Sequence, residues 1–166
     1  MGAEYSRWVP LGYDTTAERR FQLSALPLSV LWSFIYFDRY QSAQAELYVW
    51  MGELKVLKQD AVMPDFYTLL DSVFVGFAVT VAGMLGFAAA RYAYHYRGSK
   101  AIYLMRRLPD RYDLHRRCLL VPLAGAAVGV VAGFALLVIY YRHYLASTPA
   151  EALATDQWLK IWGIGR

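Results

Sequence analysis

Three long apolar runs set the pattern of this 166-residue chain. They cover residues 21–37, 66–90 and 119–141 and contain almost no charge. A helix needs about 20 apolar residues to cross the roughly 30 Å hydrocarbon core of a bilayer. The third run has that length, and the second has an uncharged portion from Val73 to Ala90. We therefore expect a transmembrane helix in each of these two runs.

The first run, 21–37, is shorter and has more than one interpretation. At 1.5 Å per residue it falls slightly short of the hydrocarbon core, and Pro27 lies inside it, so an interfacial helix is an alternative to a span. A cleavable signal peptide is another, because a basic flank, an apolar core and residues 43–45 resemble its three parts. We expect the segment to be retained and to span the membrane.

Charge supplies the reason for that choice. Eight of the 17 Lys and Arg residues lie between the second and third runs: Arg91, Arg97, Lys100, Arg106, Arg107, Arg111, Arg116 and Arg117. Basic residues near span ends resist translocation, so the basic loop, residues 91–118, is predicted to be cytoplasmic. Residues 38–65 have the opposite bias and are predicted to be external. A first run that did not cross would then leave Arg19 and Arg20 outside.

The patterns together predict an all-α, polytopic membrane protein with about three transmembrane helices. We expect a cytoplasmic segment at 1–20, a membrane domain at 21–145 and an external helix at 146–166. The predicted location is the bacterial cytoplasmic (inner) membrane, with the N-terminus inside.

Two short external helices are predicted beside the spans. Apolar residues recur at helical spacing in the first external segment: Leu47, Trp50, Leu54 and Leu57. This spacing predicts an amphipathic helix from Ala45 to Lys58. In the tail, Thr148, Pro149 and Glu151 match the start of a capped helix.

Small residues recur every four positions on the two longer spans. The stripes are Ala78, Ala82, Gly86 and Ala90 on the second span and Gly125, Gly129 and Gly133 on the third. Such stripes let helices approach closely in lipid. We expect Ala82, Gly86 and the three glycines of the third span to be helix–helix packing residues, against each other or against a partner.

Composition and candidate chemistry narrow the class. The chain is 58% hydrophobic and 16% aromatic, more than a water-soluble domain usually carries. Its formal charge of +4 is explained by the basic loop, so we expect no nucleic-acid partner. Cys118 is the only cysteine, and His95 and His115 are predicted inside while His143 is outside. No phosphate-binding GxxxxGK[ST] motif occurs. We expect no catalytic residues, metal or cofactor, and hence no enzyme.

Residues 99–108 predict an amphipathic helix inside the basic loop. One arc would carry Ala101, Ile102, Leu104, Met105 and Leu108, and the other Lys100, Tyr103, Arg106 and Arg107. Gly98 ends the preceding span, Ser99 can cap the helix and Pro109 stops it. Such a helix can lie on anionic lipid headgroups or be presented to a cytoplasmic protein.

The run from Gly98 to Pro109, GSKAIYLMRRLP, resembles the intracellular loop of type-2 ABC exporter permeases. In that family the loop forms a coupling helix that docks onto the nucleotide-binding subunit. The order of N-terminus, spans and loops is similar across roughly residues 20 to 141. The resemblance implies that an ABC-type ATPase subunit docks on Lys100, Ile102, Leu104, Met105, Arg106, Arg107 and Leu108.

The span count departs from that family, in which a half transporter usually has six spans. The resemblance therefore implies a half-length permease or an accessory membrane subunit that binds an ATPase subunit and other transporter membrane subunits in the lipid bilayer. The alternative, from a different class, is a small structural subunit of a respiratory or photosynthetic complex with no transport role.

Overall fold

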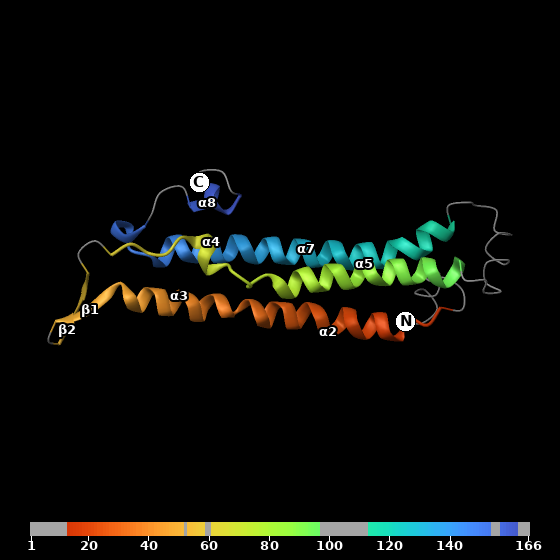
Figure 1. The fold of residues 1–166 in the computed structure, drawn as a ribbon, viewed down its shortest axis with the longest axis horizontal. Coiled ribbons are helices and arrows are strands. Elements are labelled where there is room, and N and C mark those ends of the chain that lie inside the picture. Colours follow the sequence, from red (N-terminus) through yellow and green to blue (C-terminus); the bar gives the residue numbers. More distant parts are fainter. Residues whose placement is uncertain (1–12, 52, 59–60, 97–112, 154–156, 163–166) are drawn as a thin grey trace. The chain divides into compact units, whose positions relative to one another are not determined.

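The structure is a computed structural model that describes residues 13–51, 53–58, 61–96, 113–153 and 157–162 (Figure 1). The described part is mostly helical, as predicted. Its elements are α2 (Thr16–Ser33), α3 (Ile35–Glu46), β1 (Tyr48–Met51), β2 (Leu54–Leu57), α4 (Phe66–Leu69), α5 (Val75–Tyr96), α7 (Asp113–Ser147), the 3₁₀ helix η1 (Ala150–Ala152) and α8 (Gln157–Ile161). Contacts divide the chain into two units. Unit 1 is Met1–Ser29 with Gly76–Ala132, and unit 2 is Val30–Val75 with Gly133–Arg166.

Two of the described helices are long and apolar enough to cross a membrane. They are Val75–Tyr94 in α5, with a mean hydropathy of 1.4, and His115–Ser147 in α7, with 2.3. Only 28% of the most apolar 18-residue stretch of each helix is buried, whereas a core helix of a soluble protein is mostly buried. The helix α2 is not one of the two, so the third crossing stays a prediction.

The second apolar run begins its long helix later than the predicted residue 66. The short α4 is followed by a turn in which Ser72 has a positive φ of 56°. Side chains from α2 and α3 bind this turn: Trp32 Nε1 donates to Ser72 O at 3.0 Å, and Arg39 Nη2 donates to Ser72 Oγ at 3.0 Å. Arg39 also donates to Asp71 O. Because these donors satisfy the turn's oxygens, the chain can leave the helix there and start α5 at Val75.

The first apolar run is divided between two helices at Phe34. Ser33 Oγ donates back to Val30 O at 2.7 Å and lies 2.7 Å from Tyr140 Oη. A serine that bonds the preceding turn often bends a helix. The bond lies at the break between α2 and α3, which the apolar pattern does not predict.

The predicted external helix at Ala45–Lys58 is wrong, because the structure has a β-hairpin there. The strands β1 and β2 pair antiparallel, with Val49 opposite Val56 and Met51 opposite Leu54. The helical spacing of the leucines was misleading. Aromatic and β-branched residues such as those of β1 favour strands, and in the sequence a Gly-Glu pair separates the two runs.

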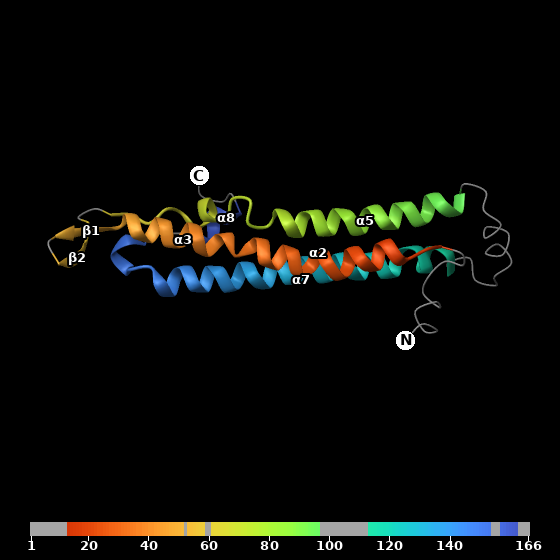
Figure 2. The same cartoon turned by 90° about the horizontal axis from the view of Figure 1, so that it is seen from below.

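In unit 1, parts of α2, α5 and α7 run side by side (Figures 1 and 2). Buried residues on α5 recur every three or four positions: Phe77, Thr80, Met84, Ala88 and Arg91. The other two helices bury Glu18 and Ser29 on α2 and Cys118, Pro122, Gly125, Ala126 and Gly129 on α7. A Cβ built on Gly125 would meet Met84 Sδ at 3.1 Å, and one on Gly129 would meet Val81 Cγ2 at 3.5 Å. Gly125 and Gly129 thus lie where α7 approaches α5 closely, and the packing role of Gly133 stays a prediction.

The small-residue stripe predicted on the second span lies on the other side of α5. Ala78, Ala82, Gly86 and Ala90 are exposed, and nothing lies within 4 Å of a Cβ built on Gly86. The predicted packing of Ala82 and Gly86 against the third span is therefore not made in the described structure. Their packing against a partner stays a prediction.

Unit 2 has an aromatic core whose polar atoms are hydrogen-bonded. Tyr36 and Tyr140 stack with ring centroids 4.5 Å apart, and Tyr36 Oη donates to Tyr140 O at 3.1 Å. Tyr40 Oη lies 3.2 Å from Thr148 Oγ1, and Tyr144 Oη donates to Pro64 O at 3.0 Å. These rings bury a large apolar area while their hydroxyls keep partners, so α3 is fixed along the end of α7.

The tail also differs from the predicted capped helix. Thr148 does not cap a helix but meets Tyr40, and the following helical turn is only the 3₁₀ helix η1. The helix α8 is attached to α4 through Gln157, whose Oε1 accepts from Phe66 N at 2.7 Å and whose Nε2 donates to Asp65 Oδ1 at 2.8 Å. Lys160 forms an ion pair with Asp65 at 2.8 Å.

The Asp65 contact makes the attachment of α8 sensitive to acid. Hydrogen bonds from Lys160 and Gln157 hold the pKa of Asp65 below its ordinary value. A lowered folded-state pKa stabilises the attachment above the unfolded value, near pH 4, and the stabilisation is lost as the pH falls through the folded value. We expect the fluorescence of Trp158, which packs on Tyr141, to change below about pH 4.

The Trp158 signal is the difference between wild-type and Trp158→Phe spectra. Asp65→Asn should remove the acid transition, whereas Glu151→Gln, at an exposed carboxylate of η1, should leave it in place. An unchanged transition in Asp65→Asn would contradict this assignment.

Two glycines of α5 test the packing of unit 1. A Cβ on Gly76 would lie 2.9 Å from Ser29 Cα, a backbone atom. We expect Gly76→Ala to lower the free energy of unfolding by about 1–3 kcal/mol, because the helices must separate. Gly86→Ala should cause no loss, because the added methyl meets open space. The stability of both variants can be measured from the temperature at which the buried Cys118 thiol becomes accessible to an alkylating reagent. Equal losses of stability in the two variants would refute the close contact at Gly76.

Candidate functional site at the base of the basic loop

All seven predicted docking residues lie outside the described residues. Lys100, Ile102, Leu104, Met105, Arg106, Arg107 and Leu108 belong to the segment 97–112. The structure describes what flanks this segment: α5 ends at Tyr96 and α7 begins at Asp113, so both ends of the predicted loop 91–118 are helical. The candidate site is therefore this base, where the chain enters and leaves the segment.

A buried ion pair between Arg91 and Glu18 forms the centre of the base. Arg91 Nε donates to Glu18 Oε2 at 3.0 Å, and Arg91 Nη2 donates to both carboxylate oxygens at 2.8 Å. Arg91 is 0% exposed and Glu18 is 1% exposed. Two-point pairing of a planar guanidinium with a carboxylate is the strongest common geometry for such a pair.

The same guanidinium reaches a third helix. Arg91 Nη1 donates to the carbonyl of Arg117 in the first turns of α7 at 2.8 Å. One side chain on α5 therefore binds α2 through a carboxylate and α7 through a backbone oxygen. All three nitrogens of the guanidinium have acceptors, as a buried cation requires.

The ring of Tyr13 lies over this cation. The Tyr13 ring centroid lies 5.7 Å from Arg91 Cζ, and Tyr13 meets Tyr94 edge to face at 5.6 Å. Burial, followed by the nearby Glu18 charge, raises the pKa of the Tyr13 phenol above its ordinary value. Tyr13 is therefore neutral at physiological pH, and a neutral ring over a cation is a favourable contact.

A second link joins α5 to α7 at the surface of the base. Tyr92 Oη lies 2.7 Å from His115 Nδ1, and the two rings are 5.7 Å apart. This hydrogen bond and the contact of Arg91 with Arg117 O both connect α5 to α7, the two helices that flank the 97–112 segment. His115, which the sequence predicts on the inner side, is hydrogen-bonded to Tyr92 in the structure.

The ion pair neutralises one of the eight positive charges of the basic loop. Arg91 is one of those eight residues, but it is buried and paired with Glu18. The sequence could not pair them, because they are 73 positions apart and no spacing rule relates a residue before the first run to one after the second.

The Arg91–Glu18 ion pair at the base of the loop is a structural contact. Its carboxylate and guanidinium are saturated by each other and by Arg117 O, which leaves no group of this pair positioned to transfer a proton. Among the described residues, no cluster of three or more His, Cys, Asp or Glu side chains could hold a metal ion.

Comparison with known protein-family models, curated proteins and solved structures gives no significant match.

The ion pair yields a direct stability prediction. Arg91→Gln should lower the free energy of unfolding by about 3–5 kcal/mol, because the carboxylate of Glu18 would stay buried without its cation. Arg20→Gln, at an exposed position two residues beyond Glu18, is the matched control and should change stability little. The measurement is thermal exposure of the buried Cys118 thiol in detergent.

The double variant Glu18→Gln/Arg91→Gln separates the pair from its parts. Since it leaves no unpaired charge, it should be more stable than Arg91→Gln alone. Additive losses from the two single changes would show that the residues do not interact.

Proposed function

We propose that this chain is a non-catalytic membrane subunit of a bacterial ABC transporter and that its basic loop docks onto the ATPase subunit. One juxtaposition carries the proposal. The amphipathic basic run from Gly98 to Pro109 lies in the sequence between α5 and α7, the two helices that are long and apolar enough to cross a membrane. This is the arrangement in which type-2 ABC exporter permeases carry their coupling helix.

A membrane location is supported by the distribution of side chains. The outward positions of both long helices are apolar: Val75, Val79 and Leu85 on α5, and Leu120, Leu123, Val128, Val130, Val131, Phe134 and Ile139 on α7. Polar side chains are instead buried, as in the 2.9 Å contact of Ser29 Oγ with Thr80 Oγ1. Lipid accepts apolar surface and leaves polar groups to pair within the protein.

The base of the loop supports a role in coupling. The contacts of Arg91 with Glu18 and with Arg117 O tie the flanks of the 97–112 segment to α2 as well as to each other. A load applied to the segment by a docked ATPase would therefore act on three helices of unit 1. A loop on freely moving ends would absorb such a load instead.

The proposed topology follows from the charges. With the basic loop in the cytoplasm, α5 and α7 each cross once, and the hairpin and the tail are external. The first run then provides a third crossing that keeps Arg19 and Arg20 inside. Other membrane subunits of the transporter would complete the substrate path, because three helices are too few to surround one.

Copurification tests the proposal. The tagged chain, extracted from native membranes in a mild detergent, should bring an ABC-type ATPase subunit with it. Leu104→Asp or Met105→Asp should reduce the bound ATPase by about tenfold, because a charge would enter the apolar arc of the docking helix. Tyr103→Asp, on the opposite arc, is the matched control and should retain it.

Two outcomes would overturn the proposal. If no ATPase copurifies even with the wild-type chain, the docking assignment fails. If redox subunits copurify in its place, the chain belongs to the other class, the small structural subunits of respiratory or photosynthetic complexes.

A further inference from the structure

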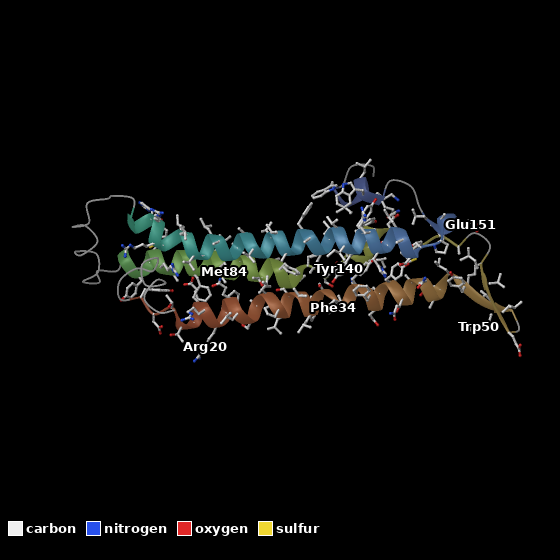
Figure 3. The ribbon with its side chains drawn as sticks, turned by 180° about the vertical axis from the view of Figure 1, so that it is seen from behind. Arg20, Phe34, Trp50, Met84, Tyr140 and Glu151 are labelled. Atoms are coloured by element: carbon white, nitrogen blue, oxygen red, sulfur yellow. The ribbon has the colours of Figure 1, made fainter. Side chains whose placement is uncertain are left out.

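The helix α8 lies back along α7 instead of continuing away from it. The helix α7 ends at Ser147, but Trp158 of α8 packs on Tyr141, about 9 Å back along α7 at 1.5 Å per residue, with ring centroids 4.8 Å apart. Figure 3 shows the same return, with Glu151 of η1 beyond the end of α7 and α8 beside α7 near the labelled Tyr140. The tail therefore brings α8 to the level of the last turn of the apolar run 119–141.

Contacts with the rest of unit 2 hold α8 in this position and leave one side of it uncovered. Gln157 and Lys160 bind Asp65, while Trp158 packs on Tyr141 and Ile161 packs against the aromatic core. The remaining two residues lie three positions apart, on one side of a helix. They are Leu159, which is 44% exposed, and Trp162, which is 55% exposed.

The level of Tyr141 is the outer edge of the bilayer under the proposed topology. As a helix, the uncharged run 119–141 is about 34 Å long, slightly more than the roughly 30 Å of hydrocarbon. Arg116 and Arg117 directly precede the run, and basic residues of this kind stay at the inner edge. Tyr141 then lies about 4 Å past the outer edge of the hydrocarbon, inside a headgroup layer about 5–7 Å thick.

The chemistry of the uncovered side matches this layer. Tryptophan is enriched at membrane interfaces, because its ring is apolar and its N–H is polar. The apolar outward surface of α7 reaches the same level, since Ile139 is 56% exposed. Because α8 lies beside α7 and not over its end, lipid surrounds its outer side at this depth. Two side chains are also far less than the roughly 800 Å² per partner of a standard protein interface.

We infer that Leu159 and Trp162 of α8 insert into the outer headgroup–acyl boundary of the bilayer and anchor unit 2 there. Through Gln157 and Lys160, this anchor also holds α4, the short helix before the turn that leads into α5. The inference goes beyond the proposed function, because it needs α7 to cross a bilayer but needs no ATPase.

Fluorescence quenching tests the anchor in the purified chain, reconstituted into phosphatidylcholine vesicles. A nitrobenzoxadiazole fluorophore is attached to Leu159→Cys or, as the matched control, to Glu151→Cys at an exposed position of η1, both in a Cys118→Ser background. Phosphatidylcholine brominated near the top of its acyl chains should quench position 159 about twofold or more over position 151. Iodide, present on both sides of the bilayer, should quench the two positions in the reverse order.

A third position separates this inference from the proposed function. Val130→Cys lies in the middle of the apolar run, where Val130 is 58% exposed, and lipid brominated near the ends of its acyl chains should quench a fluorophore there. Quenching by brominated lipid at 130 but not at 159 refutes the anchor and leaves the proposed membrane subunit intact. Absence of such quenching at 130 refutes the membrane location and with it the proposed function.

The other contrary results identify what surrounds α8 instead of lipid. Quenching of position 159 by iodide alone would place α8 in water. Quenching by neither brominated lipid nor iodide would place Leu159 against protein, either a second copy of the chain or another part of it. Each of these two results would overturn the inference.

Discussion

The buried ion pair of Arg91 and Glu18 is the contact on which the arrangement of unit 1 depends. A charge taken out of water is costly unless its partners are close and complete. Here the guanidinium binds a carboxylate of α2 and a carbonyl of α7, so three helices must stay in register for either charge to be satisfied. The pair lies where α5 and α7 lead into the 97–112 segment. The same contact that fixes the helices therefore also fixes the ends of the proposed docking loop.

The two units satisfy their buried polar groups in different ways. Unit 1 brings backbones close at small residues such as Gly76 and Gly125, and it pairs the hydroxyls of Ser29 and Thr80. Unit 2 uses stacked tyrosines whose hydroxyls reach backbone carbonyls or other hydroxyls. Both arrangements leave apolar side chains on the outside of the long helices, where a bilayer can accept them. Polar contacts inside and apolar surface outside are thus common to both units.

The sequence predicted the features that local pattern controls. Apolar length identified the two long helices, and charge bias identified the basic connection between them. Prediction from the sequence was wrong or incomplete where contacts between residues far apart in the chain decide the local structure. The break before α5 depends on donors from Trp32 and Arg39. The four-residue repeat of Ala82 and Gly86 predicts a packing face on α5, but that face is exposed, and the close contact is made at Gly76, which the repeat does not include. The pairing of Glu18 with Arg91 has no local signal, and the hairpin was missed because its leucines also fit a helical period.

The central claim is that α5 and α7 each cross a bilayer with the basic loop in the cytoplasm. Single cysteines at Glu53, Ser99 and Glu151, in a Cys118→Ser background, test it through labelling of intact bacterial cells with a membrane-impermeant maleimide. The account predicts labelling at positions 53 and 151 in intact cells and at position 99 only after permeabilisation. Labelling of position 99 in intact cells, or protection of positions 53 and 151, would contradict it.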